Sequence, residues 1–235
     1  MLFDIDGTIL LTGGAGREAL ELAFAELAPE VPTERVVEAA ARVEYGGRTD
    51  PLILGDIARN LGWDAPTFAP MAEELMRRYV HHLGRRLAHA ESPARLMPGI
   101  RALLAVLAED ARASLGLITG NSEAGARTKL EPFDLNGYFP IGGYGSDHAD
   151  RREVARVAHS RSEAWYERRF LPEQVVVIGD TAHDVDCAHA NGFRVLGVGT
   201  GGRTAEVTAA RPDHYLDDLS DTQAAAEAIF TLSAP

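Results

Sequence analysis

Short apolar runs alternate with helical patterns along most of the chain. Runs that fit β-strands lie at residues 1–5, 113–119, 174–180 and 194–200, with a weaker fifth at 138–144. Apolar positions at helical spacing predict helices at residues 99–109, 122–131, 151–168, 183–190 and 219–230. Strands that alternate with helices are typical of a parallel sheet with helices on both faces. We therefore predict an α/β fold.

Residues 13–95 lack this alternation. Their apolar positions indicate helices alone, at about 16–28, 33–43, 51–61 and 67–88, with prolines between them. We therefore expect an all-helical cap domain of residues 13–95, inserted into an α/β core domain of residues 1–12 and 96–235. The predicted core is a Rossmann-like parallel sheet.

Composition narrows the range of partners and compartments. The net charge of −12 over 235 residues disfavours nucleic acid and anionic membrane surfaces as partners. A lone cysteine, Cys187, fits a reducing compartment, and no apolar run is long enough to span a bilayer. Because Asp4 and Asp6 interrupt the first apolar run, we expect no signal peptide. The expectation is a cytoplasmic protein, monomeric or homodimeric, that acts on a small molecule.

Three predicted strands end in polar residues. The motifs are FDIDGT, with Asp4 and Asp6, LITGNS at residues 117–122, and VIGDTAHD, with Asp180 and Asp184. The carboxyl ends of parallel strands meet at one edge of the sheet, so these side chains should share a cleft. Carboxylates this close repel one another unless a cation lies between them. Several carboxylate oxygens with a phosphate ligand suit Mg²⁺.

Residues Thr119, Gly120 and Asn121 stand where a helix is expected to begin. A hydroxyl group and free backbone N–H groups at a helix N-terminus form an anion site. An anion site beside a metal site and a free carboxylate favours phosphoryl transfer through an aspartyl phosphate.

The motifs FDIDGTIL, LITGNS and VIGDTAHDVDCA, in this order, resemble those of the haloacid dehalogenase superfamily. The layout is most similar to that of phosphoglycolate phosphatase-like members. The resemblance implies that Asp4 is the nucleophile and Asp6 the general acid and base. Superfamily enzymes that cleave carbon–halogen bonds lack the second acid, so Asp6 favours a phosphate substrate.

The same resemblance assigns the ligands. It implies that Mg²⁺ is held by Asp4, by the backbone carbonyl of Asp6 and by Asp180. It further implies that Thr119 and the N–H group of Asn121 bind phosphate. Asp184 is either a further metal ligand or a partner that holds the basic residue of the site.

The basic residue departs from the family pattern. Members of the family usually carry a lysine upstream of the fourth strand, but the only lysine here, Lys129, follows the second strand. We therefore place Lys129 outside the site. The phosphate-binding role of the family's usual lysine is assigned to Arg151, with Arg152 as the alternative. An arginine suits a phosphate because its planar group donates two parallel hydrogen bonds.

In the predicted cap, the stretch YGGRTDPLIL at residues 45–54 offers two features. Asp50 before Pro51 is a good N-cap with proline at the first helical position. Arg48 follows two glycines and is either a ligand for a substrate anion or a surface arginine.

The expected function is Mg²⁺-dependent hydrolysis of a small phosphorylated metabolite, such as phosphoglycolate, through an aspartyl phosphate. A mutase of the beta-phosphoglucomutase type is an alternative, because it shares the cap and the motifs. A phospho-acceptor signalling domain also uses acids, a threonine and Mg²⁺, but it needs no cap. A non-catalytic role would be expected to lose Asp4 or Asp6.

Overall fold

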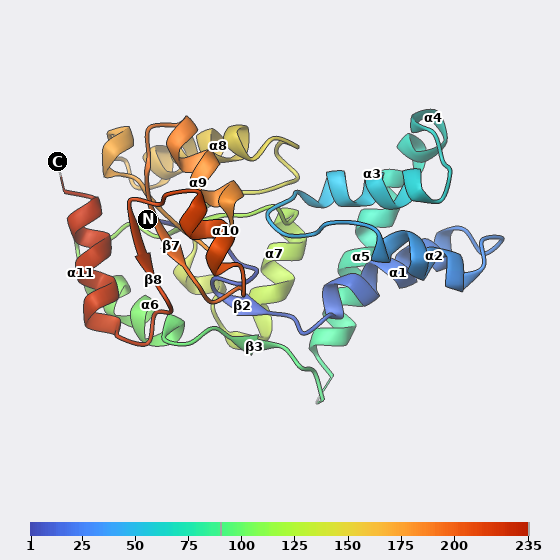
Figure 1. Cartoon of the computed structure of the whole chain (residues 1–235), viewed down its shortest axis with the longest axis horizontal. Helices are drawn as coiled ribbons and strands as arrows, with labels where there is room; N and C mark the ends of the chain where they lie inside the picture. The colour runs from blue at the N-terminus through green and yellow to red at the C-terminus, as the bar shows by residue number, and fades with distance from the viewer. Residues whose placement is uncertain (90, 235) are drawn as a thin grey trace.

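The computed structural model describes residues 1–89 and 91–234. It consists of a lobe built around a β-sheet and a second, helical lobe beside it (Figure 1). The sheet has six strands: β1 (Leu2–Phe3), β4 (Gly116–Ile118), β5 (Gly142–Gly143), β6 (Val176–Gly179), β7 (Arg194–Val198) and β8 (His214–Leu216). Their order is β5-β4-β1-β6-β7-β8, and all five neighbouring pairs are parallel. The predicted α/β fold with a Rossmann-like parallel sheet is confirmed.

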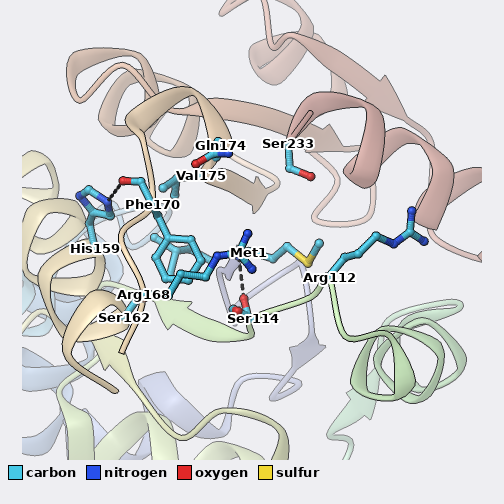
Figure 2. Close-up of a pocket in the computed structure, with 11 residues that line it drawn as sticks. Met1, Arg112, Ser114, His159, Ser162, Arg168, Phe170, Gln174, Val175 and Ser233 are labelled. Atoms are coloured by element: carbon cyan, nitrogen blue, oxygen red, sulfur yellow. Dashed lines mark hydrogen bonds between the residues drawn. The ribbon is translucent and has the colours of Figure 1, made fainter. Parts of the chain in front are cut away.

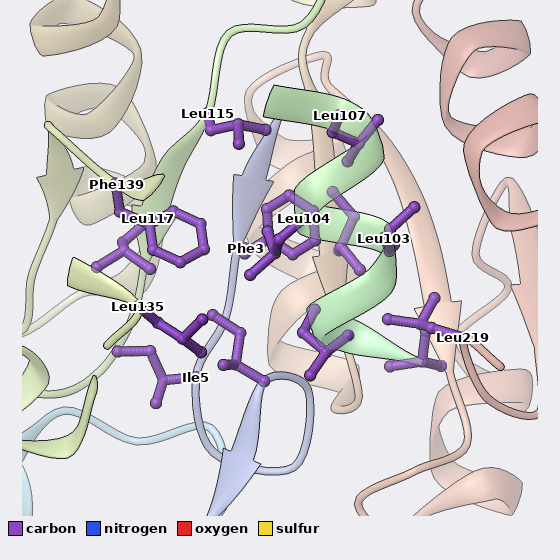
Figure 3. Packing of buried hydrophobic residues seen from close by; sticks show 14 of the residues in the cluster. Phe3, Ile5, Leu103, Leu104, Leu107, Leu115, Leu117, Leu135, Phe139 and Leu219 are labelled. Atoms are coloured by element: carbon purple, nitrogen blue, oxygen red, sulfur yellow. The ribbon is translucent and has the colours of Figure 1, made fainter. Parts of the chain in front are cut away.

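Helices cover both faces of the sheet because successive strand residues point to opposite sides. Phe3 and Leu117 pack with α6 (Ile100–Glu109), α7 (Glu123–Leu130) and α11 (Thr222–Leu232), as Figure 3 shows for α6. Leu2 and Ile118 pack on the other face with α8 (Arg151–Trp165) and α9 (Ala182–Ala190). The central strands are buried on both faces, which explains why they read as continuous apolar runs.

The helical lobe has its own group of buried side chains, all from residues 15–87. Its elements are α1 (Ala15–Leu27), α2 (Thr33–Ala41), α3 (Asp50–Asn60), α4 (Ala65–Phe68), the 3₁₀ turn η1 (Ala69–Met71) and α5 (Ala72–Leu87). The helix predicted at 67–88 is broken near its start, because Pro70 lacks the N–H group that a continuous helix needs. The division into a core and a cap domain remains a prediction, which this separate cluster supports. No helix within residues 1–89 and 91–234 is both long and apolar enough to span a membrane.

Some elements escaped the sequence patterns. Strand β2 (Leu10–Leu11) pairs antiparallel with β3 (Arg95–Leu96), so the two connections to the helical lobe lie side by side. The edge strand β8 is three residues long and partly exposed, and α10 (Thr204–Ala209) is a short helix. The 3₁₀ turns η2 (Glu131–Phe133), η3 (Asn136–Tyr138) and η4 (Pro172–Gln174) complete the described elements. Elements this short have too few residues to establish a periodicity.

Candidate active site

A cavity of about 310 Å³ lies at the carboxyl ends of the strands, between the sheet and the helical lobe. Its wall includes eight of the nine residues proposed from the sequence: Asp4, Asp6, Arg48, Thr119, Gly120, Asn121, Arg151 and Asp180. The ninth, Asp184, lies directly behind this wall, where it accepts a hydrogen bond from Arg151. The three polar strand ends therefore converge as the sheet topology predicts.

Three buried carboxylates cluster at the cavity: Asp4 and Asp180 line it, and Asp184 lies behind them. Oxygen atoms of Asp4, Asp180 and Asp184 all lie within 4.8 Å of one another. Burial, followed by the charge of Asp184, raises the pKa of Asp4 well above its ordinary value. The same two causes raise the pKa of Asp180 to about 7. The carboxyl groups of Asp4 and Asp180 therefore hold protons more tightly than exposed ones.

Arg151 is the cation that faces this cluster. Its Nη2 donates to Asp4 Oδ1 at 3.1 Å and also to Asp184 Oδ1. Burial lowers the pKa of Arg151, but the carboxylates of Asp184 and Asp4 raise it by more, so the guanidinium group stays charged. Arg152 instead lies at the surface and pairs with Asp186 at 2.8 Å. Of the two arginines, the structure brings Arg151 to the acids.

Asp184 is fully buried, and both of its carboxylate oxygens already have partners. Oδ1 accepts from Arg151, while Oδ2 accepts from the backbone N–H group of Thr181 at 3.0 Å and from its hydroxyl group at 2.7 Å. This arrangement favours the second sequence interpretation, in which Asp184 holds the basic residue instead of binding the metal.

The surroundings of Asp4 and Asp180 fit a divalent cation. Thr8 Oγ1 donates to Asp180 Oδ1 at 3.0 Å, and Gly7 and Gly201 lie so close to this carboxylate that a Cβ on either would overlap it. Among the described residues, no hydrogen bond is recorded for Oδ2 of Asp4 or Asp180. Hard carboxylate oxygens in a buried cluster are suitable ligands for Mg²⁺.

Thr119, Gly120 and Asn121 of the LITGNS motif line the same cavity. Ser122 is the N-cap of α7, and its hydroxyl group accepts from the N–H group of Gly125. Thr119 Oγ1 accepts from Asn121 Nδ2 at 2.7 Å and, more weakly, from the Asn121 N–H group at 3.3 Å. Asn121 Nδ2 also donates to Asp6 Oδ2 at 2.7 Å. The Asn121 side chain thus links the proposed phosphate-binding threonine to the proposed general acid.

Lys129 lies in the site, and the prediction that placed it outside is wrong. Its Nζ lies 2.7 Å from both carboxylate oxygens of Asp6 and 2.6 Å from Asn121 Oδ1. Lys129 lies two turns into α7, but helical side chains tilt toward the N-terminus and a lysine is long enough to reach back to the strand end. Its spacing of eight residues from Asn121, a full two turns, was the available signal.

The loop before α3 lies against the core site. The N-cap of α3 is Thr49 rather than Asp50, which corrects the sequence assignment. Asp50 donates its backbone N–H to Gly120 O at 2.7 Å, and its carboxylate accepts from the Ser122 N–H group at 2.7 Å. Asp50 therefore joins the helical lobe to the start of α7. Arg48 lines the cavity, and its Nη1 is paired with Asp56 of α3.

A smaller hollow of about 70 Å³ lies at the opposite, amino ends of the strands (Figure 2). There the Met1 amino group donates to Ser114 O at 2.8 Å, and His159 Nε2 lies 2.8 Å from Phe170 O. None of the clustered acids lines it. Ligand sites of parallel sheets lie at the carboxyl ends, so the larger cavity is the candidate active site.

A family model for haloacid dehalogenase-like hydrolases matches residues 1–198, which include all three motifs. The chain belongs to this family. This match confirms the predicted superfamily. Together with the phosphatase relatives described next, it also confirms the predicted enzyme class, a phosphoric monoester hydrolase.

Two kinds of curated relatives match. Phosphoglycolate phosphatase of Haemophilus influenzae is 24% identical over 228 residues, which cover 93% of each chain. Tyrosine-protein kinase PtkA of Mycobacterium tuberculosis is 36% identical over 107 residues, or 45% of this chain. That match spans only 35% of the length of the kinase.

Solved structures share the fold over nearly the whole chain. A predicted phosphoglycolate phosphatase from Haemophilus somnus superposes with a TM-score of 0.69 at 17% identity, covering 95% of this chain and 96% of the other. A Thermotoga maritima protein assigned as a beta-phosphoglucomutase superposes with a TM-score of 0.59 at 19% identity, covering 97% of each chain.

Proposed function

We propose that this chain is a Mg²⁺-dependent phosphatase that hydrolyses a small phosphorylated metabolite through an aspartyl phosphate on Asp4. The observation that carries the proposal is the placement of Asp4. Its carboxylate is buried at the end of β1 beside Arg151 and faces the same cavity as Asp6 and Thr119. A nucleophile, a proton-transfer group and an anion site in one cavity are the parts that phosphoryl transfer needs.

In the first step, an oxygen of Asp4 attacks phosphorus and the bond from phosphorus to the ester oxygen breaks. The electron pair goes to the ester oxygen, which takes a proton from Asp6. Arg151 orients Asp4 and offers positive charge to the phosphoryl oxygens, and the Thr119 hydroxyl group donates a hydrogen bond to one of them. A Mg²⁺ ion bound by Asp4, the Asp6 carbonyl and Asp180 would neutralise the charge of the phosphoryl group.

In the second step, water attacks the phosphorus of the aspartyl phosphate and releases phosphate and Asp4. The carboxylate that Asp6 acquired in the first step takes the proton from this water. The helical lobe covers the cavity through the loop that carries Gly47 and Arg48, which keeps bulk water away from the intermediate. The buried carboxylate of Asp4 therefore acts as the nucleophile, and the more exposed carboxylate of Asp6 transfers the protons.

The relatives suggest the substrate class but leave its identity to experiment. The full-length similarity to phosphoglycolate phosphatases favours a small phosphate ester, and Arg48 is the cavity arginine proposed to bind a second anion. A mutase of the beta-phosphoglucomutase type remains the alternative. Incubation with a panel of phosphoglycolate, sugar phosphates and phosphotyrosine separates them, because a phosphatase releases phosphate whereas a mutase returns an isomer.

The nucleophile is tested by Asp4→Asn. We expect phosphate release to fall by at least about 10³-fold, since an amide cannot attack phosphorus, with an unchanged circular dichroism spectrum. Asp186→Asn is the matched control, because Asp186 is an exposed acid of α9 that is paired with Arg152. Activity of Asp4→Asn within tenfold of wild type would remove Asp4 from the proposed role.

A further inference from the structure

The only lysine of the chain is buried against the proposed general acid. The side chain of Lys129 is 6% exposed, and its ammonium group lies 2.7 Å from each oxygen of Asp6. The side chain of Asp6 is 43% exposed, so Asp6 faces the cavity while it is paired with the buried Lys129. A charged group is seldom buried to this degree unless it is paired.

The ammonium group has no donor left for a substrate. It carries three N–H groups, and the structure records three acceptors within 2.7 Å: both oxygens of Asp6 and Asn121 Oδ1. The Asn121 amide completes the arrangement by donating to Asp6 Oδ2 at 2.7 Å. Because all three N–H groups of Lys129 already have acceptors, Lys129 is not a phosphate ligand in this arrangement. Its contacts favour a role exerted through Asp6.

We propose that Lys129 is a positioning residue for Asp6, which it holds, with Asn121, in the orientation for proton transfer to the leaving group. The inference rests on the proposed function. An aspartate side chain on an exposed cavity wall has several rotamers, and fixing one of them places its oxygen at the leaving atom. Lys129 also faces the negative charge that Asp6 acquires as its proton passes to the ester oxygen.

Leaving-group dependence tests this role. A phenolate leaving group needs the proton of Asp6, whereas 2,4-dinitrophenolate leaves without one. The ratio kcat/KM covers only the steps up to release of the leaving group, so hydrolysis of the aspartyl phosphate does not affect it. The experiment compares kcat/KM for phenyl phosphate and 2,4-dinitrophenyl phosphate in wild type, Asp6→Asn, Lys129→Met and the double variant.

We expect Lys129→Met to lower kcat/KM for phenyl phosphate by on the order of 10²-fold, within the range that general acid catalysis contributes. The value for 2,4-dinitrophenyl phosphate should stay within about threefold. In the Asp6→Asn background, Lys129→Met should cause no further loss on phenyl phosphate, because both changes disable the same step.

Arg127→Met is the matched control, since it removes another cation of α7 that donates to Phe139 O and Tyr144 outside the cavity. It should leave the ratio between the two substrates as in wild type. If Lys129→Met does not fold, Lys129→Gln keeps an uncharged amide group that can donate to Asp6 and should show a smaller selective loss.

The positioning role would be overturned by equal losses on both substrates or by no loss on either. Additive losses in the double variant would also refute it, because Lys129 would then act independently of Asp6. Failure of the proposed function looks different. In that case wild type would release no phosphate, or Asp6→Asn itself would not distinguish the two substrates.

Discussion

Removal of the Arg151 side-chain charge should destabilise the protein strongly and in a pH-dependent way. Arg151 is 8% exposed and faces the carboxylates of Asp4 and Asp184 from within hydrogen-bond distance. In Arg151→Met, three clustered carboxylates lose the buried cation that faces them. The variant therefore tests directly whether this arginine holds the acid cluster together.

The magnitude follows from the cost of leaving a buried charge without its partner. Breaking a buried pair by removing one side costs about 3–5 kcal/mol. For a chain of this size, 1 kcal/mol corresponds to about 2–4 °C in Tm, so the expected decrease is about 6–20 °C at pH 8. The decrease in Tm should lie at the low end of this range if the clustered carboxylates take up protons.

The pH dependence has a definite sign. Arg151 lowers the pKa of Asp4, which burial and Asp184 raise, so its removal raises that pKa further. The folded variant then binds protons more tightly than the unfolded chain, and its stability relative to wild type improves as the pH falls. We expect the difference in Tm to be largest at pH 8 and smaller at pH 5.5. Mg²⁺ should restore part of it at pH 8.

Scanning calorimetry without metal, at the two pH values, measures these changes. Arg152→Met is a close control, because the neighbouring arginine forms an exposed pair with Asp186 and its loss should leave Tm nearly unchanged. Equal Tm values for Arg151→Met and Arg152→Met at pH 8 would refute the reasoning. So would a deficit that grows as the pH falls.

Two further predictions concern the metal and the substrate. Because protons compete for Asp180, whose pKa is raised from 3.8 to about 7, Mg²⁺ affinity measured by titration calorimetry should rise by up to about tenfold per pH unit below pH 7 and level off above it. A pH-independent affinity would mean that Asp180 is not a ligand. Arg48→Ala should raise KM for phosphoglycolate by about tenfold to a hundredfold, the loss of one charge-assisted contact of about 1.5–3 kcal/mol, and leave an aryl phosphate unaffected. Equal losses on both substrates would show that Arg48 acts through its partner Asp56 on the helical lobe instead.

Much of the fold follows from local patterns because the central strands are buried on both faces. Val176, Val177 and Ile178 form one apolar run whose members pack alternately with the two helical layers. The Asp4, Asp180 and LITGNS positions follow from the same topology, since each stands at the end of a parallel strand. Such residues are predictable because the sheet itself brings them together.

Contacts that depend on side-chain reach or on the two lobes were not predictable in this way. Asp50 reads as a helix cap, because Pro51 follows it and local spacing says nothing about Ser122, 72 positions away. Arg48 likewise gave no sign that it pairs with Asp56. The Asp50 contact depends on how the helical lobe docks, which is a tertiary property, whereas the Arg48 pair depends on side-chain reach within that lobe.

The two acids of the FDIDGT motif, Asp4 and Asp6, are paired with different cations. Asp4 is buried and paired with the rigid, permanently charged guanidinium group of Arg151, which suits a carboxylate that must stay fixed and ionised for attack. Asp6 reaches the cavity and is paired with Lys129, a single point of charge that holds the carboxylate from one side and leaves its other side open. Arg151 lies on α8 and Lys129 on α7, on opposite faces of the sheet. Here the division allows a change at Lys129 to affect proton transfer while the acid cluster around Asp4 keeps its counter-charge.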